Sequence, residues 1–147
     1  MSLINELRAK SEIVENKREE VIAEIKASFD KVLNGERFEK HLERYIDASD
    51  IKDRKTFMNV EFWEYHEGCT TTYFKCGGIV WYNPENKDGC NSHTYKGVEL
   101  RSINKEVCNY LASKLMDRMN ELGFNLVSKE AQKSRFDYYH TNFYFGW

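Results

Sequence analysis

Residues 56–66 read TFMNVEFWEYH, and this stretch decides which fold we expect. In an extended chain, successive side chains point to opposite sides. One side would carry Met58, Val60 and Phe62, and the other would carry Phe57, Trp63 and Tyr65. Because both sides are largely apolar, the sequence predicts a strand that is covered on both faces.

The segments that follow continue this pattern. Residues 70–76 (TTTYFKC) are rich in β-branched and aromatic side chains, which favours a second, antiparallel strand. Gly77 and Gly78 then indicate a bulge or a tight turn, after which residues 79–82 (IVWY) resume the strand. We therefore expect three strands in succession.

A long helix is expected over residues 103–122, where apolar side chains recur at helical spacing. Gly123 followed by Phe124 suits a Schellman-type helix end. Beyond it we expect a strand over 124–127, a polar connection over 128–135 and a long aromatic strand over 136–147. The pattern predicts an α+β fold in which an antiparallel sheet of about five strands packs against this helix.

The first 50 residues predict a helical extension made of two helices. Residues 3–33 contain neither proline nor glycine, and apolar residues recur every three or four positions from Val21 to Leu33. Asn34 and Gly35 suit a helix end, and a second amphipathic helix follows through Ile46. We expect residues 1–50 to form this extension and residues 51–147 an aromatic-rich α+β domain, packed as one compact unit.

The charge and hydropathy of the chain limit its partners. It has 22 Lys and Arg against 24 Asp and Glu, without the basic surplus that duplex nucleic acid requires. No stretch approaches the roughly 20 apolar residues that span a bilayer, and no signal-peptide core begins the chain. We expect a cytoplasmic protein without a membrane or duplex partner, whose four cysteines are reduced.

The aromatic residues are unevenly distributed. Eighteen of the 21 follow Lys55. A domain of this size has few elements with which to cover so many rings. We therefore expect either the N-terminal helices or a second subunit to cover the outer face of the sheet, and we predict a homo-oligomer.

The polar loop after the third strand contains the binding residues that we single out. Flat rings can stack, amides can form hydrogen bonds, and a lysine can offset a negative charge, which suits a protein partner or a small nucleotide-like ligand. In the competing interpretation, Trp81 belongs to the core and the loop merely connects two elements. The candidate residues are Trp81, Tyr82, Asn83, Lys87, His93 and Tyr95.

Two Cys–His pairs suggest a zinc-stabilised module as a further alternative. His66 and Cys69 form one pair, Cys90 and His93 the other, and two such pairs could supply four N/S ligands. Against this hypothesis, zinc knuckles usually pair Cys with Cys. Cys90 beside His93 could also act as a nucleophile, but no protease, nucleotide-binding or carboxylate-pair motif accompanies it. We therefore expect no enzyme and assign no cofactor.

Three segments give the chain its resemblance to small uncharacterised proteins of phages and prophages from low-GC Gram-positive bacteria. They are residues 38–43 (FEKHLE), 119–124 (MNELGF) and 145–147 (FGW). The resemblance implies a host-cytoplasm setting in which such proteins often bind and block host factors or defence signals. The expectation is thus a non-enzymatic binding protein that occupies the surface of a host factor, for example as an inhibitor of a defence system.

Overall fold

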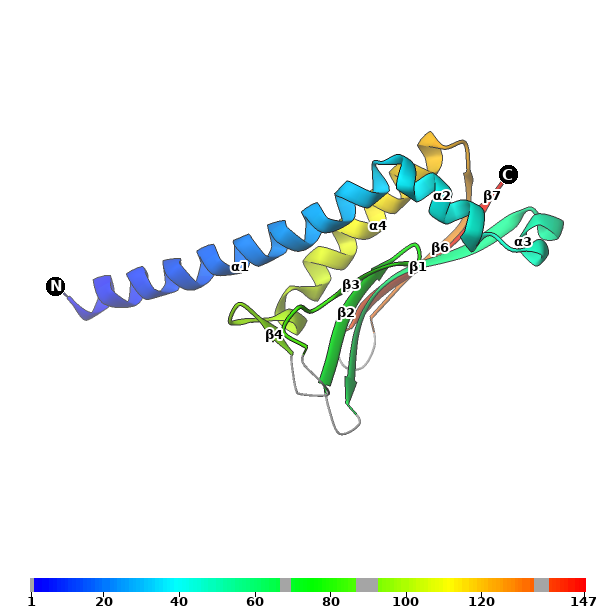
Figure 1. The fold of residues 1–147 in the computed structure, drawn as a ribbon. Helices are drawn as coiled ribbons and strands as arrows, with labels where there is room; N and C mark the ends of the chain where they lie inside the picture. Colours follow the sequence, from blue (N-terminus) through cyan, green and yellow to red (C-terminus); the bar gives the residue numbers. More distant parts are fainter. Residues whose placement is uncertain (1, 67–69, 87–92, 134–137) are drawn as a thin grey trace.

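The computed structural model describes residues 2–66, 70–86, 93–133 and 138–147. Helices α1, α2 and α3 lead the chain, and strands follow them on either side of a further helix, α4 (Figure 1). The helices are α1 (Leu3–Leu33), α2 (Glu36–Tyr45), α3 (Ala48–Asp53) and α4 (Asn104–Glu121), the last preceded by a 3-10 turn, η1 (Leu100–Ile103). The strands are β1 (Lys55–His66), β2 (Thr70–Cys76), β3 (Ile79–Tyr82), β4 (Thr94–Tyr95), β5 (Val98–Glu99), β6 (Asn125–Lys133) and β7 (Tyr139–Gly146).

Five strands form one antiparallel sheet in the order β3-β2-β1-β7-β6. β1 lies at its centre, between β2 and the last strand of the chain. Helices α1 and α4 lie side by side on one face of the sheet (Figure 1). The predicted α+β fold, with a five-stranded antiparallel sheet against a long helix and an N-terminal helical segment before it, is confirmed.

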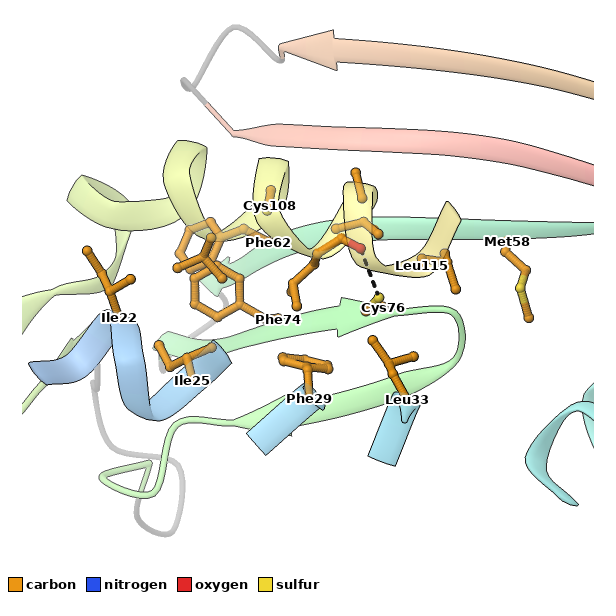
Figure 2. Close-up of a cluster of buried hydrophobic side chains, with 14 of the residues drawn as sticks. Ile22, Ile25, Phe29, Leu33, Met58, Phe62, Phe74, Cys76, Cys108 and Leu115 are labelled. Atoms are coloured by element: carbon orange, nitrogen blue, oxygen red, sulfur yellow. Dashed lines mark hydrogen bonds between the residues drawn. The ribbon is translucent and has the colours of Figure 1, made fainter. Parts of the chain in front are cut away.

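The core lies between this sheet face and the two long helices (Figure 2). The carboxyl half of α1 supplies Val21, Ile22, Ile25, Phe29 and Leu33, all buried at the helical spacing that the sequence predicts. The sheet and α4 contribute a second set of fully buried side chains. These are Met58, Val60, Phe62, Phe74, Cys76, Phe143 and Phe145 from the sheet, with Val107, Leu111, Leu115 and Met119 from α4.

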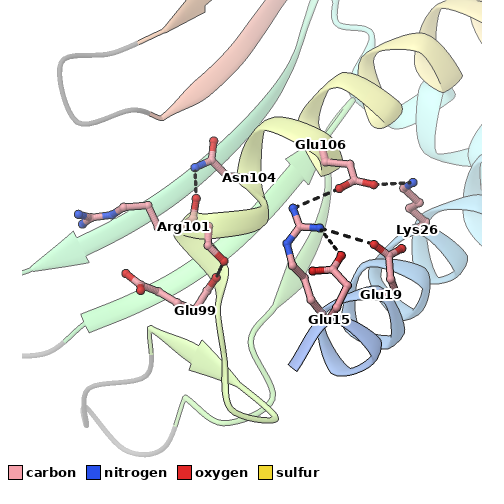
Figure 3. A network of polar contacts seen from close by, with 9 residues as sticks. Glu15, Glu19, Lys26, Glu99, Arg101, Asn104 and Glu106 are labelled. Carbon is pink, nitrogen blue, oxygen red and sulfur yellow. Dashed lines mark hydrogen bonds and ion pairs between the residues drawn. The ribbon is translucent and has the colours of Figure 1, made fainter. Parts of the chain in front are cut away.

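Polar contacts fix α1 against α4 outside the core. The Tyr110 hydroxyl donates to Asp30 Oδ2 at 2.7 Å. Burial and this hydrogen bond together raise the pKa of Tyr110 to about 12. Further along the helices, the Glu106 carboxylate of α4 forms ion pairs with Arg18, at an N···O distance of 3.4 Å, and with Lys26, at 3.9 Å (Figure 3). The second half of α1 is therefore tied to the body by both packing and charge.

Three local features differ from the sequence prediction. Residues 128–133, expected as a polar connection, extend β6, because an edge strand needs no apolar side chains when both its faces meet solvent. Asp47 caps an unpredicted helix, α3, by accepting from the Asp50 amide at 2.8 Å. The polar loop expected after the third strand includes β4, which pairs with β5 in a small hairpin. Residue 136, the predicted start of the last strand, lies outside the described residues, and β7 begins at Tyr139.

Within the single chain, the described residues of β1 are covered on one face only. Phe57 and Trp63 are 38% and 43% exposed, whereas Met58, Val60 and Phe62 on the other side are buried. The physical reason is the position of α1, which packs against α4, β3 and β5 on the already covered face. The helical extension therefore does not wrap the far face, which we call the open face.

Candidate functional site

The structure separates the two aromatic residues that lead the candidate loop. Trp81 points toward the helices, where its ring lies 6.0 Å from that of Phe74 and 5.6 Å from that of Tyr95. Tyr82, the next residue of β3, points to the open face and is 62% exposed. Trp81 thus packs against the core, as the competing interpretation proposed, and the two rings cannot hold one ligand between them.

Asn83 and Tyr95 form hydrogen bonds that hold the loop in place. The buried Asn83 amide donates to Thr94 O at 2.8 Å and to Thr72 Oγ1 at 3.3 Å, and its Oδ1 accepts from the Glu85 amide. Tyr95 is buried, and its hydroxyl donates to Glu24 Oε1 on α1 at 2.6 Å.

The remaining two candidates are His93 and Lys87. His93 is exposed, and Lys87 lies outside the described residues. The described candidates therefore do not converge on one site.

The zinc hypothesis falls largely outside the described residues. Cys69 and Cys90 lie outside the described residues, and of the two histidines only the exposed His93 has a described side chain. Cys76 and Cys108 are free thiols in the core, where burial raises the pKa of both. A thiol held protonated by burial is a poor nucleophile, so neither of these two cysteines suits covalent catalysis.

The open face carries an aromatic row across three neighbouring strands. Trp63 of β1 pairs with Tyr73 of β2, which pairs with Tyr82 of β3. The Tyr73 and Tyr82 rings lie 5.7 Å apart. Because directly paired residues of antiparallel strands project from the same side, the three rings form one continuous patch. Sequence alternation places Trp63 on this side, but only the register adds the two tyrosines.

A second aromatic pair lies at the other end of the open face. Phe57 and Tyr144 are register partners, their rings 5.4 Å apart, and Lys55 Nζ lies 5.4 Å from the Tyr144 ring centroid. Tyr144 is 41% exposed, so the pair is accessible to a partner.

Polar side chains fill the space between the two aromatic groups. Glu61 has Lys75 and His140 as its register partners, and Asn59 faces Asn142. His140 Nε2 lies 2.7 Å from Gln132 Oε1. Glu61, Trp63, His140 and Asn142 also line a hollow of about 320 Å³, whose two other lining residues, Phe62 and Tyr138, contact each other on the covered face. The open face thus joins rings at both ends to a balanced polar centre.

A second exposed surface is the amino-terminal half of α1, residues 3–17, which extends beyond the body of the protein (Figure 1). Its large apolar side chains are between 48% and 69% exposed. They are Leu3, Ile4, Leu7, Ile13 and Val14. Ile13 and Val14 also line a groove of about 330 Å³ against Val98 of the β4–β5 hairpin.

Comparison of the chain with models of known protein families, with curated proteins and with solved structures gives no match. None of the described helices combines the length and the apolar character needed to cross a membrane. The interpretation of the open face and of α1 therefore depends on their own chemistry.

Proposed function

We propose that this chain is a non-enzymatic binding protein that docks a protein partner on the open face of its sheet. The observation that carries the proposal is the row in which the exposed rings of Trp63 and Tyr82 flank the partly buried ring of Tyr73, beside the polar centre. Large rings that keep a hydrogen-bonding edge dominate the energetics of protein interfaces. The partner is proposed to be a host protein, in the phage setting that the sequence resemblance implies, and a defence component is the kind of factor it would block.

The charges on the open face favour a protein over a nucleic acid. Glu61 lies between Lys75 and His140, and Glu130 of β6 faces Asn142. A surface for single strands would combine its stacking rings with a positively charged groove along the backbone. Here acids and bases alternate, which suits a polar interface with a second protein.

We also propose that two copies of the chain associate through the exposed half of α1. The buried residues of α1 all lie in its second half, between Val21 and Leu33. A helical segment as short as residues 3–17 is only marginally stable in water when nothing packs against it. In an antiparallel pair, Leu3 and Leu7 of one copy would cover Val14 and the groove beside Val98 of the other. The five exposed apolar side chains of each copy make ten in the pair, and part of each is already buried. Burying the rest would contribute on the order of 10 kcal/mol, which offsets the cost of association.

Two double variants separate these surfaces. Trp63→Ser/Tyr82→Ser removes rings from the open face, and Leu7→Ser/Val14→Ser removes apolar side chains from α1. Each serves as the matched control for the other. We expect the α1 variant to become monomeric by light scattering and the open-face variant to keep the oligomeric state of the wild type.

The partner is sought by cross-linking each protein in cytosolic extract of a low-GC Gram-positive bacterium. The wild type and the α1 variant should retain the same host protein in stoichiometric amount, and the open-face variant should lose it. Retention by all three proteins would refute docking on the open face. Turnover in a hydrolase or nuclease screen would refute the non-enzymatic proposal.

A further inference from the structure

A separate groove is lined by residues of α1, α2 and β3. Figure 1 shows the end of α1 that leads into α2, at the opposite end of this helix from the N-terminus. Its volume is about 320 Å³, and it is lined by Val32, Arg37, Lys40, His41, Arg44 and Ile79. Such a volume falls within the range of small-molecule sites, which runs from roughly 300 to 1,000 Å³. Four of the six lining side chains can carry a positive charge, and none can carry a negative one.

The cations come from one stripe of α2. At 3.6 residues per turn, Arg37, Lys40 and Arg44 project within a sector of about 60°, and the acidic residues of the helix occupy a different stripe. Like charges at these spacings destabilise a helix. Among the described residues, none of these three cations has an ion-pair partner. The repulsion among these three cations would be relieved by an anion bound in the groove.

The back of the groove is built to a fixed shape. His41 Nε2 donates to Gly77 O at 2.8 Å, since a carbonyl oxygen can only accept. Gly78 lies so close that an added Cβ would meet His41 Nε2 at 2.7 Å. The His41 ring is also flanked by Phe38 at 6.0 Å and Tyr45 at 5.5 Å between ring centroids. The turn between β2 and β3 thus fixes the position of His41 at the back of the groove.

We propose that this groove binds a small organic phosphate. Two guanidinium forks and one ammonium group match the oxygens of a phosphate, and the apolar Val32 and Ile79 offer contact to an uncharged remainder. A long polyanion fits less well, because Glu36, Glu39 and Glu43 form the adjacent stripe of the same helix. The site is distinct from the open face and does not depend on the function proposed for it.

Titration calorimetry at low salt tests the proposal, with inorganic pyrophosphate and adenosine monophosphate as probes. The test variant is Arg37→Gln/Lys40→Gln/Arg44→Gln. The matched control, Arg8→Gln/Lys52→Gln/Lys129→Gln, removes the same charge from exposed positions elsewhere. Because hydrogen bonds to charged groups are the strong ones, we expect the test variant to lose affinity at least about tenfold and the control to change less than about twofold.

Nuclear magnetic resonance supplies an independent readout. Binding should shift backbone amide signals of residues 36–45 and 77–79 and leave those of the open face unchanged. All six substituted side chains are exposed, so neither variant should unfold at a lower urea concentration than the wild type. The proposal is overturned if the wild type binds neither probe, if both variants weaken equally, or if a single-stranded oligonucleotide binds where the small probes do not.

Discussion

Replacing Arg101 with methionine tests how the sheet tolerates a carboxylate on its covered face. The Glu64 side chain is 3% exposed, and the Arg101 guanidinium contacts it from η1. The Tyr138 hydroxyl also donates to Glu64 Oε2, at 2.6 Å. The hydrogen bond to Glu64 raises the pKa of Arg101, which shows that the guanidinium is favoured in its charged form here. Methionine keeps most of the volume and removes the charge.

The expected cost follows from the burial of the two partners. Removing one member of a fully buried ion pair costs about 3–5 kcal/mol, because the other charge is left uncompensated. Arg101 is itself 41% exposed, so solvent screens the pair and the expected cost falls to about 2–3 kcal/mol. A second substitution, Glu64→Gln, removes the stranded charge. The double variant Glu64→Gln/Arg101→Met should therefore be more stable than Arg101→Met alone, by about 1 kcal/mol.

Urea unfolding followed by tryptophan fluorescence measures these differences. With a slope of about 1–3 kcal/mol per molar urea, the midpoint of Arg101→Met should fall by roughly 1–2 M, and the double variant should recover part of this shift. Lys105→Met, on the exposed side of α4, is the control and should leave the midpoint nearly unchanged. If Arg101→Met and the double variant are equally destabilised, the stranded-charge explanation is wrong.

Two further predictions concern contacts between the helices and the sheet. The hydrogen bond from Tyr95 lowers the pKa of Glu24, because it favours the ionised carboxylate. This hydrogen bond therefore stabilises the fold fully above the ordinary glutamate pKa of 4.5, and the stabilisation is lost as the pH falls through the lowered pKa. The urea midpoints of the wild type and Tyr95→Phe should therefore converge as the pH is lowered from neutral to below 4.5, and a constant difference would contradict this. Gly78→Ala should cost about 2–4 kcal/mol, because its positive φ of 87° and its contact with His41 both oppose a Cβ. Gly97→Ala has a similar φ but open space, and should cost only about 1 kcal/mol in the same unfolding assay.

The fold could be predicted because its main elements have strong periodic signals. The apolar spacing from Val21 to Leu33 gave the buried stripe of α1, and the alternation in residues 56–66 gave β1. The extent of β6 could not be predicted, because its strand character comes from pairing with β7 and its side chains remain exposed. Local pattern carries no information about a partner strand distant in sequence.

The candidate site could be predicted only in part, for a related reason. Alternation fixes that Trp81 and Tyr82 project to opposite sides, but it does not say which side is covered. That choice depends on where α1 docks, a long-range outcome. Likewise, the register that joins Trp63 to Tyr73 is a property of the folded sheet. The cations of α2 were visible in the sequence, yet the groove needs Ile79 from β3 to close it.

The unpaired edge of the outer strand β6 affects how this protein behaves during expression and storage. Its outward backbone edge has no partner in the described sheet, and such an edge can recruit a strand from another molecule into a growing fibril. Lys129, Glu130 and Lys133 stand along it as charged gatekeepers. A chain stripped of these charges would be expected to precipitate on standing even though its folded stability had not changed.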